Sequence, residues 1–422
     1  MQGSFGSIPK YILNKRNEYQ AQYEARPDPF IRTDLPRLVD ESRAAVAKLI
    51  NAPLETVVFV NNATEGVNTV LRNMVWNEDG KDVMISFSTI YDACARAEDF
   101  VVDYFEGKVD VREIELLYPL EDDEIITMFR EEVKKLESEG KRARLAMFDV
   151  VSSNPGLVFP WEAMVAACRE LNVLSLVDGA QGIGMVHLDL SATDPDFFVS
   201  NCHKWLHTPR GCAVFQVPLR NQDLLPTTLG TARGYKPKKP GRGRTQPLPD
   251  GEGKNHFVRN FEWVGTRDDS AYICVKDAIA WRRDVLGGED KIISYLWDLN
   301  KKGIARVAEI LGTTYLENKA GTLTNCGMAN VALPLWVGDK GKELAPEGHT
   351  VLTSEEASVA FNWMQNTLVE EYKTFMAVYY RWDRFWVRIS AQVYLEMEDY
   401  EWAGEALKDV VARVAKGEFR EE

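Results

Sequence analysis

Short apolar runs alternate with segments of helical periodicity through the first half of the chain. The apolar runs are rich in Val, Ile, Leu and Phe, and each is short enough to be a buried strand. Strands are predicted at residues 57–60, 83–87, 145–151, 174–177, 197–200 and 212–217. Helices are predicted at residues 36–50, 67–75 and 161–171, with a turn at residues 61–66. Strands that alternate with helices predict an α/β fold, in which helices sandwich a mainly parallel sheet.

The length of the chain, 422 residues, allows a large core and more than one domain. We expect an N-terminal segment at residues 1–35, a large domain at residues 36–285 and a smaller α/β C-terminal domain at residues 286–422. Residues 230–254 are rich in Gly, Pro, Lys and Arg and lack apolar periodicity. This composition predicts a long mobile loop, either a solvated insertion or a lid over a substrate site.

Charge and composition argue against several function classes. The net charge of −14 and a pI near 5.1 disfavour nucleic acid or an anionic membrane as the main partner. No apolar run approaches the ~20 residues of a membrane span, and the N-terminus has no signal-peptide pattern. The six cysteines show no paired CxxC spacing. We therefore expect reduced thiols, no metal site and a cytoplasmic location.

Lys204 is the most informative residue of the chain. It follows the predicted strand at residues 197–200, whereas most lysines lie on the solvated surface. Asp178 stands 26 positions earlier, at the end of the predicted strand 174–177. A lysine amine that forms a Schiff base and a carboxylate that keeps a pyridine nitrogen protonated are what pyridoxal phosphate chemistry requires. The pair therefore predicts an enzyme that uses this cofactor.

Other polar side chains follow predicted strands at the same edge of the sheet, where ligands bind in parallel α/β proteins. The candidates are Thr64, Tyr91, Ser153, Asp178, Gln181, His203 and Lys204. Thr64 stands near a predicted helix start, where backbone N–H groups and a hydroxyl favour an anion. A simple helix cap at Thr64 and a core position for Tyr91 remain alternative interpretations.

Together these residues resemble the fold-type I pyridoxal phosphate enzymes of the class V aminotransferase family. Within it, the chain is similar to the isopenicillin-N-epimerase-like branch, which includes the fungal hercynylcysteine sulfoxide lyases of ergothioneine biosynthesis. The resemblance extends over nearly the whole chain and is carried by residues 3–6, 25–27, 40–47, 62–64, 178–184, 201–206 and 388–395. The pair of Asp178 and Lys204 is specific for the superfamily, and the run at 388–395 for a narrower branch.

The resemblance implies a role for each candidate at the cofactor. Ala63, Thr64 and His203 would hold the phosphate. Asp178 would pair with the pyridine nitrogen, and Tyr91 would stack on the ring. Gln181 and Ser153 would lie near the ring hydroxyl. Gly265 and Thr266 would close the phosphate site of the partner subunit in a homodimer.

The resemblance also implies substrate contacts. Arg388 would grip the α-carboxylate of a small amino-acid substrate, because a guanidinium binds a carboxylate through two hydrogen bonds. Ser4 is a further substrate-binding candidate, and Arg32 is a candidate for a distal acidic group.

The activity implied is that of a carbon–sulfur lyase that cleaves a cysteine sulfoxide conjugate by β-elimination. Lys204, Tyr91 and Asp178 would be catalytic, with Lys204 removing the α-proton and Tyr91 protonating the leaving sulfur. The products would be a sulfenic acid or thiol, pyruvate and ammonia. A cyclase or substitution enzyme of loline-type alkaloid biosynthesis, an amino-acid epimerase and a cysteine desulfurase remain alternatives. A desulfurase would need a mobile nucleophilic cysteine.

Two positions depart from the family pattern. Gln2 stands where family members often carry His, which predicts either a truncated start or a different substrate entrance. Asp92 stands beside Tyr91 where members often carry Gly, which predicts an altered substrate preference.

Overall fold

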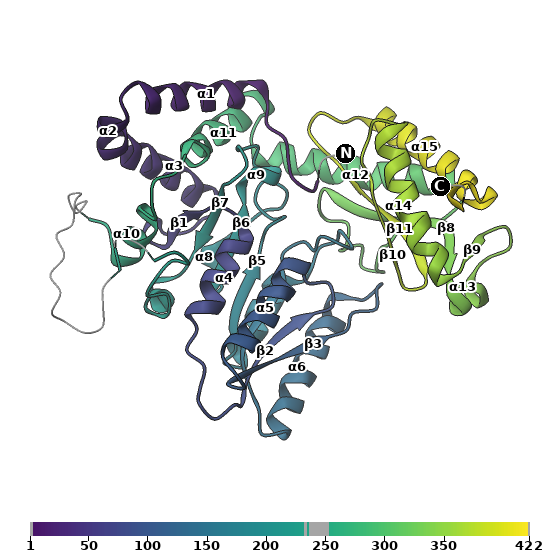
Figure 1. Cartoon of the computed structure of the whole chain (residues 1–422), viewed down its shortest axis with the longest axis horizontal. Helices are drawn as coiled ribbons and strands as arrows, with labels where there is room; N and C mark the ends of the chain where they lie inside the picture. Colours follow the sequence, from purple (N-terminus) through teal and green to yellow (C-terminus); the bar gives the residue numbers. More distant parts are fainter. Residues whose placement is uncertain (1–2, 232–233, 236–252, 421–422) are drawn as a thin grey trace.

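The computed structural model of the chain describes residues 3–231, 234–235 and 253–420, which form a larger and a smaller lobe (Figure 1). The larger lobe contains a seven-stranded sheet. Its strands are β1 (Val57–Val60), β2 (Asp82–Phe87), β3 (Val109–Ile114), β4 (Arg142–Asp149), β5 (Leu174–Asp178), β6 (Phe197–Asn201) and β7 (Ala213–Gln216). They are ordered β1-β7-β6-β5-β4-β2-β3. Only β7 is antiparallel to its neighbours, so the described sheet is mainly parallel, as predicted.

Helices cover both faces of this sheet. Alternate side chains of a strand point to opposite faces, so strands such as β1, β2 and β6 are buried along their whole length. One face packs against α4 (Ala63–Asn73), α5 (Asp92–Tyr104) and α10 (His256–Glu262). The other packs against α3 (Leu35–Leu49), α6 (Asp122–Ser138), α7 (Trp161–Glu170) and α11 (Ser270–Leu286). The other α-helices in the described part of this lobe are α1 (Lys10–Ala25), α2 (Pro27–Pro29), α8 (Leu190–Thr193) and α9 (Cys202–Trp205).

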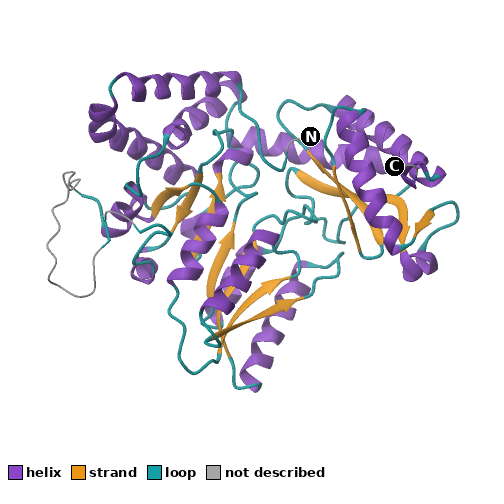
Figure 2. Cartoon of the chain, viewed as in Figure 1, coloured by secondary structure: helices purple, strands orange, loops and turns teal. Residues whose placement is uncertain are grey.

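The smaller lobe is built on a second sheet, drawn in orange on the right of Figure 2. Its strands are β8 (Met328–Val337), β9 (Thr350–Leu352), β10 (Ala377–Arg381) and β11 (Arg384–Ser390), in the order β10-β11-β8-β9. Helices α12 (Glu289–Leu311), α13 (Gly338–Leu344), α14 (Ser354–Glu370) and α15 (Met397–Lys416) complete the lobe. Helix α12 follows α11 after two glycines and connects the lobes (Figure 1).

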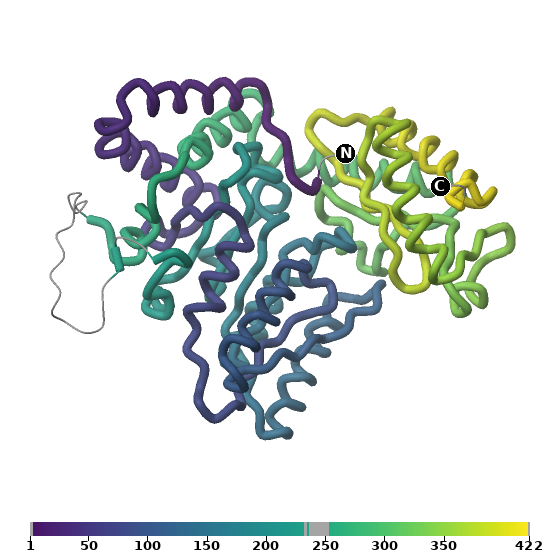
Figure 3. The backbone as a smooth tube through the Cα atoms, in the orientation of Figure 1, coloured from purple at the N-terminus to yellow at the C-terminus, as the bar shows by residue number. Residues whose placement is uncertain are grey.

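The N-terminal segment, residues 3–9, lies at the junction of the two lobes before the chain enters α1 (Figure 3). Gly6 has a positive φ of 67°, and a Cβ atom at this position would collide with the carbonyl oxygen of His203. Arg210 Nη2 donates to the Gly6 carbonyl at 3.0 Å. The segment is therefore packed directly against the turn that carries Lys204.

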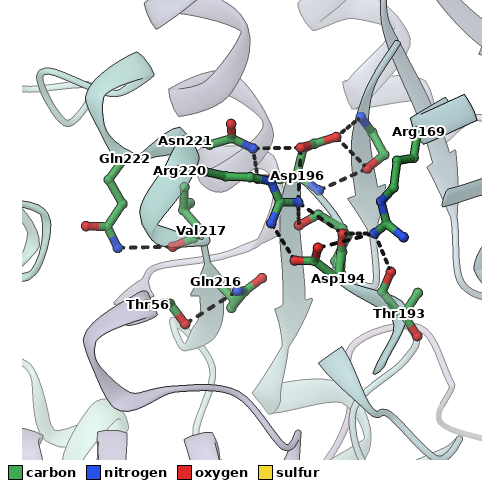
Figure 4. A network of polar contacts seen from close by, with 12 residues as sticks. Thr56, Arg169, Thr193, Asp194, Asp196, Gln216, Val217, Arg220, Asn221 and Gln222 are labelled. Atoms are coloured by element: carbon green, nitrogen blue, oxygen red, sulfur yellow. Dashed lines mark hydrogen bonds and ion pairs between the residues drawn. The ribbon is translucent and has the colours of Figure 1, made fainter. Parts of the chain in front are cut away.

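A polar network holds the amino ends of β5 and β6 (Figure 4). The Asp196 carboxylate accepts from Ser175 N at 3.0 Å and from Arg220 Nη2 at 3.2 Å. Asp194, in the left-handed conformation, accepts from Arg220 Nη1 at 2.5 Å, and its carbonyl accepts from Arg169 at 2.8 Å. These bonds anchor the edge of the sheet opposite to Lys204.

The predicted strands and helices are all present, but several of their boundaries are wrong, and two of these errors concern the site. The helix predicted from residue 67 begins at Ala63, inside the predicted turn, because the Asn62 side chain caps it by accepting from Glu65 N at 2.9 Å. The strand predicted to residue 151 ends at Asp149. Most of the predicted loop 230–254 lies outside the described residues, as does Gln2. Within the described ranges, no helix is long and apolar enough to cross a membrane.

Candidate active site

Lys204 and Asp178 lie at the carboxyl edge of neighbouring parallel strands. Asp178 is the last residue of β5 and pairs with Val199 of β6. Lys204 lies in α9, the single turn that follows β6. Burial lowers the pKa of Lys204 from 10.5 to about 8, while the charge of Asp178 acts in the opposite direction. The amine of Lys204 therefore lies close to a buried carboxylate and has a pKa much nearer to neutral pH than that of a lysine in water.

Hydrogen bonds favour the ionised form of Asp178. Its carboxylate accepts from Ala180 N at 2.8 Å and from Cys94 Sγ at 3.4 Å. Burial raises the pKa of Asp178, and these two bonds together with the charge of Lys204 oppose that rise. A carboxylate held in this way can face a protonated ring nitrogen, because the charge pair offsets the cost of desolvation.

Asp149 is a second buried carboxyl, which the sequence analysis did not single out. It ends β4, pairs in register with Asp178 and is 8% exposed. No described group donates a hydrogen bond to it. Burial and the charge of Asp178 raise the pKa of Asp149 well above its ordinary value. Since neighbouring carboxyls in a buried site disfavour each other's ionisation, the hydrogen bonds that Asp178 accepts favour the negative charge on Asp178 over Asp149.

Arg388, on β11 of the smaller lobe, reaches the same edge. Its Nη1 donates to the carbonyl of Ser153 at 2.7 Å and to Ser153 Oγ at 3.1 Å, and its Nη2 donates to Ser4 Oγ. The side chain is 5% exposed, its Nε lacks a partner, and no carboxylate of the described residues forms an ion pair with it. Burial lowers the pKa of Arg388 to about 10. A buried guanidinium without a counter-ion is suited to an anionic ligand.

Gln181 has one free donor in this region. The indole Nε1 of Trp205 donates to Gln181 Oε1 at 2.7 Å, and both residues are buried. The amide nitrogen Nε2 of Gln181 is buried without a partner among the described residues. An unsatisfied buried donor costs stability, so this nitrogen fits a role as donor to a ligand oxygen such as the predicted ring hydroxyl.

The start of α4 lies next to the Lys204 turn, because Ala63 N donates to Asn201 Oδ1 at 2.9 Å. This bond occupies the backbone N–H of Ala63, which was predicted to bind phosphate. The hydroxyl and N–H of Thr64 are not used in any described hydrogen bond. His203 Nδ1 lies 2.9 Å from the carbonyl oxygen of Cys212, so the ring donates there. Burial lowers the pKa of His203 to about 4, and a bound dianion would raise it.

The structure does not bring every predicted site residue to this cluster. Tyr91 is 46% exposed at the N-cap of α5. Arg32 is exposed and pairs with Asp28 at 3.2 Å, one helical turn away. Gly265 and Thr266 lie in the loop between α10 and α11, where the next residue, Arg267, donates to Asn61 Oδ1 at 3.3 Å. The roles predicted for these residues remain predictions.

Two further predictions concern Asp92 and the cysteines. Asp92 is exposed at the first position of α5, 3.9 Å from Arg96. All six cysteines are buried and none forms a disulfide. Within the described part of the chain, no group of three or more His, Cys, Asp or Glu could hold a metal ion.

Comparisons with known proteins agree with the fold described above. The family model for aminotransferase class-V matches residues 7–246. The chain is 34% identical to L-cysteine desulfhydrase-like protein lolT1 of Epichloe uncinata, over 99% of this chain and 93% of that protein. It is 30% identical to hercynylcysteine sulfoxide lyase of Schizosaccharomyces pombe, over 96% of this chain and 92% of that protein. A solved structure of the cystine C–S lyase C-DES with its product cysteine persulfide superposes with a TM-score of 0.73 at 17% identity, covering 95% and 94% of the two chains.

Proposed function

Since the chain belongs to the aminotransferase class-V family, we propose that it is a pyridoxal phosphate-dependent carbon–sulfur lyase acting on a cysteine sulfoxide conjugate. The observation that carries the proposal is the cluster that Lys204 forms with the buried side chains of Asp178 and Arg388 at one edge of the sheet. Hercynylcysteine sulfoxide is the leading candidate substrate, because the relative of that name matches nearly the whole chain. The reaction consumes one water and releases a sulfenic acid, pyruvate and ammonia.

The residues at the site fit the cofactor, pyridoxal phosphate. Lys204 would bind its aldehyde carbon, Asp178 its pyridine nitrogen and the free Nε2 of Gln181 its ring oxygen. Thr64 and His203 would hold the phosphate at the start of α4, where the helix dipole favours an anion. When bound, the cofactor withdraws electrons from the substrate α-carbon.

Arg388 positions the substrate. Its Nε has no hydrogen-bond partner and no described carboxylate pairs with it, so its guanidinium suits an α-carboxylate. Lys204, with a pKa near 8, is then suited to remove the α-proton at neutral pH. When the carbon–sulfur bond breaks, its electron pair goes to the sulfur, and the leaving group takes up a proton. Tyr91, half-exposed at the carboxyl edge of the sheet, is the proposed donor.

A desulfurase mechanism is disfavoured by the cysteines. Such an enzyme needs a reactive thiolate that can reach the substrate sulfur. All six cysteines of this chain are buried, and burial raises the pKa of five of them: Cys94, Cys168, Cys212, Cys274 and Cys326. These thiols are protonated and inaccessible. Cyclisation, substitution and epimerisation share the same first proton transfer and are distinguished by products.

The assembly that suits this site is a homodimer, in which Gly265 and Thr266 complete the phosphate site of the partner subunit. The next residue, Arg267, donates to Asn61 Oδ1 at 3.3 Å, which ties this loop to the segment that precedes α4. Equilibrium sedimentation of the purified protein tests this arrangement, and a monomer at micromolar concentration would exclude it.

The test of the activity is incubation of the purified, cofactor-loaded protein with hercynylcysteine sulfoxide, S-methylcysteine sulfoxide and free cysteine, with pyruvate as the readout. Rapid release from the hercynyl conjugate, with slow release from the other two, is expected. Rapid release from cysteine alone would instead indicate a desulfhydrase. No pyruvate from any of the three would remove the lyase proposal and favour a cyclase or substitution enzyme.

A further inference from the structure

We propose that Arg381 binds a second carboxylate of the substrate, carried by the substituent on sulfur. This inference rests on the proposed lyase function and narrows its substrate class. The preferred substrates are then cysteine conjugates that carry an acidic group on the far side of the sulfur. Cysteine itself, or a conjugate with a plain alkyl substituent, lacks the group that Arg381 recognises.

Arg381 is placed by a tight hairpin. It ends β10, and the two-residue turn Trp382–Asp383 leads directly into β11, with φ values of 54° and 59°. A two-residue hairpin turn of this kind has both central residues in the left-handed region, and it fixes Arg381 directly opposite Arg384. The hairpin lies on the side of the smaller lobe that faces the larger lobe (Figure 1). Arg388 lies on the same hairpin, seven residues further along.

The two arginines bind consecutive carbonyl groups of one loop. Arg388 Nη1 donates to Ser153 O at 2.7 Å, and Arg381 Nη1 donates to Asn154 O at 3.4 Å. Arg381 Nη2 also donates to Ser88 O at 2.7 Å, in the loop that leads to Tyr91. Both guanidinium groups therefore border the same region beyond the ends of β2 and β4. A ligand held by Arg388 at one end can meet Arg381 at the other.

Arg381 has spare donors and no counter-ion. None of the described carboxylates lies within ion-pair distance of it, and its side chain is only partly exposed. A guanidinium has five N–H donors, of which two are used here.

Two further donors next to Arg381 are also unsatisfied. The Tyr118 hydroxyl and Trp382 Nε1 are buried without a hydrogen-bond partner among the described residues. The two rings pack with centroids 6.1 Å apart, and the Arg381 guanidinium lies 5.3 Å from the Trp382 ring. Buried donors are nearly always paired, so these two donors beside the spare N–H groups of Arg381 indicate an acceptor-rich ligand. A carboxylate presents two acceptor oxygens and the charge that a guanidinium prefers.

The test uses two probes of equal chain length, S-(2-carboxyethyl)-L-cysteine sulfoxide and S-propyl-L-cysteine sulfoxide. For the cofactor-loaded wild type we expect kcat/KM, from pyruvate release, to be about tenfold or more higher with the carboxylate probe. Arg381→Gln should abolish this preference by raising KM for the carboxylate probe far more than for the propyl probe. Arg381→Lys should keep part of it. Asp383→Asn, in the same turn, is the matched control and should keep all of it.

Binding is measured in parallel, so that the proposal is tested even without turnover. Dissociation constants for S-(2-carboxyethyl)-L-cysteine and S-propyl-L-cysteine come from the change in cofactor absorbance on titration. Equal affinity of the wild type for both compounds, or an unchanged preference in Arg381→Gln with a normal thermal melt, would overturn the role of Arg381. Absence of pyruvate from both sulfoxides, with a binding preference that depends on Arg381, would instead refute the lyase step alone.

Discussion

The reactivity of Lys204 should depend on pH in a way that its surroundings dictate. In water a lysine amine has a pKa near 10.5, and burial lowers the value for Lys204 to about 8. Only the neutral amine is a nucleophile, and it is present above the pKa. At pH 7 the neutral fraction therefore rises from about one in 3,000 to about one in ten.

Two charged neighbours shift the pKa of Lys204, which is the midpoint of its titration, in opposite directions. The carboxylate of Asp178 raises the pKa of Lys204, and the guanidinium of Arg388 lowers it. Asp178→Asn should therefore move the midpoint below 8, and Arg388→Met should move it above 8. Each shift should be about one pKa unit, the usual effect of a nearby charge in a partly buried site.

The assay is acetylation of the protein after removal of its cofactor. Brief labelling between pH 6 and pH 10, followed by mass spectrometry of the Lys204 peptide, gives the rate at each pH. The wild-type rate should rise with pH and level off above a midpoint near 8. A midpoint near 10.5, or shifts of the two variants in the same direction, would refute the reasoning about burial and charge.

Three other substitutions follow from single contacts. Asp149→Asn should keep activity within about threefold, because burial and the charge of Asp178 raise the pKa of Asp149 and so favour its neutral form. Asp178→Asn should lower kcat by about 100-fold in the pyruvate assay. Equal losses in the two variants would contradict the assignment of the charge to Asp178. Arg282→Leu should cost about 3–5 kcal/mol in urea unfolding, since the fully buried guanidinium of Arg282 pairs with Glu289 at 2.6 Å and donates to two backbone carbonyls. Its exposed neighbour Arg283 is the control, and Arg283→Leu should cost under about 0.5 kcal/mol. Gly6→Ala should raise KM strongly by displacing the N-terminal segment, and a normal KM would show that the segment does not form part of the site.

The core of the site could be predicted because its signals are local. Lys204 and Asp178 each follow an apolar run, and the rule that ligands bind beyond strand ends brings them together. Asp149 follows the same rule but was missed. The predicted strand extended to residue 151, so this carboxyl was placed inside a strand instead of at its end.

Contacts between distant segments left no trace in the sequence. Ala63 carries a backbone N–H at a helix start, which predicts anion binding, but the tertiary contact with Asn201 already uses that donor. The bonds of Arg388 to Ser4 and Ser153 join segments hundreds of residues apart. Arg381 was missed because a lone arginine at a hairpin end is usually a solvated surface residue.

The most direct test of the account is identification of the residue that binds pyridoxal phosphate. The purified protein is reduced with borohydride, digested, and searched by mass spectrometry for the pyridoxyl group. We expect the group on the peptide that contains Lys204 and on no other peptide, with loss of the yellow colour in Lys204→Ala. A pyridoxyl group on a different lysine, or cofactor binding and full activity in Lys204→Ala, would contradict the central claim.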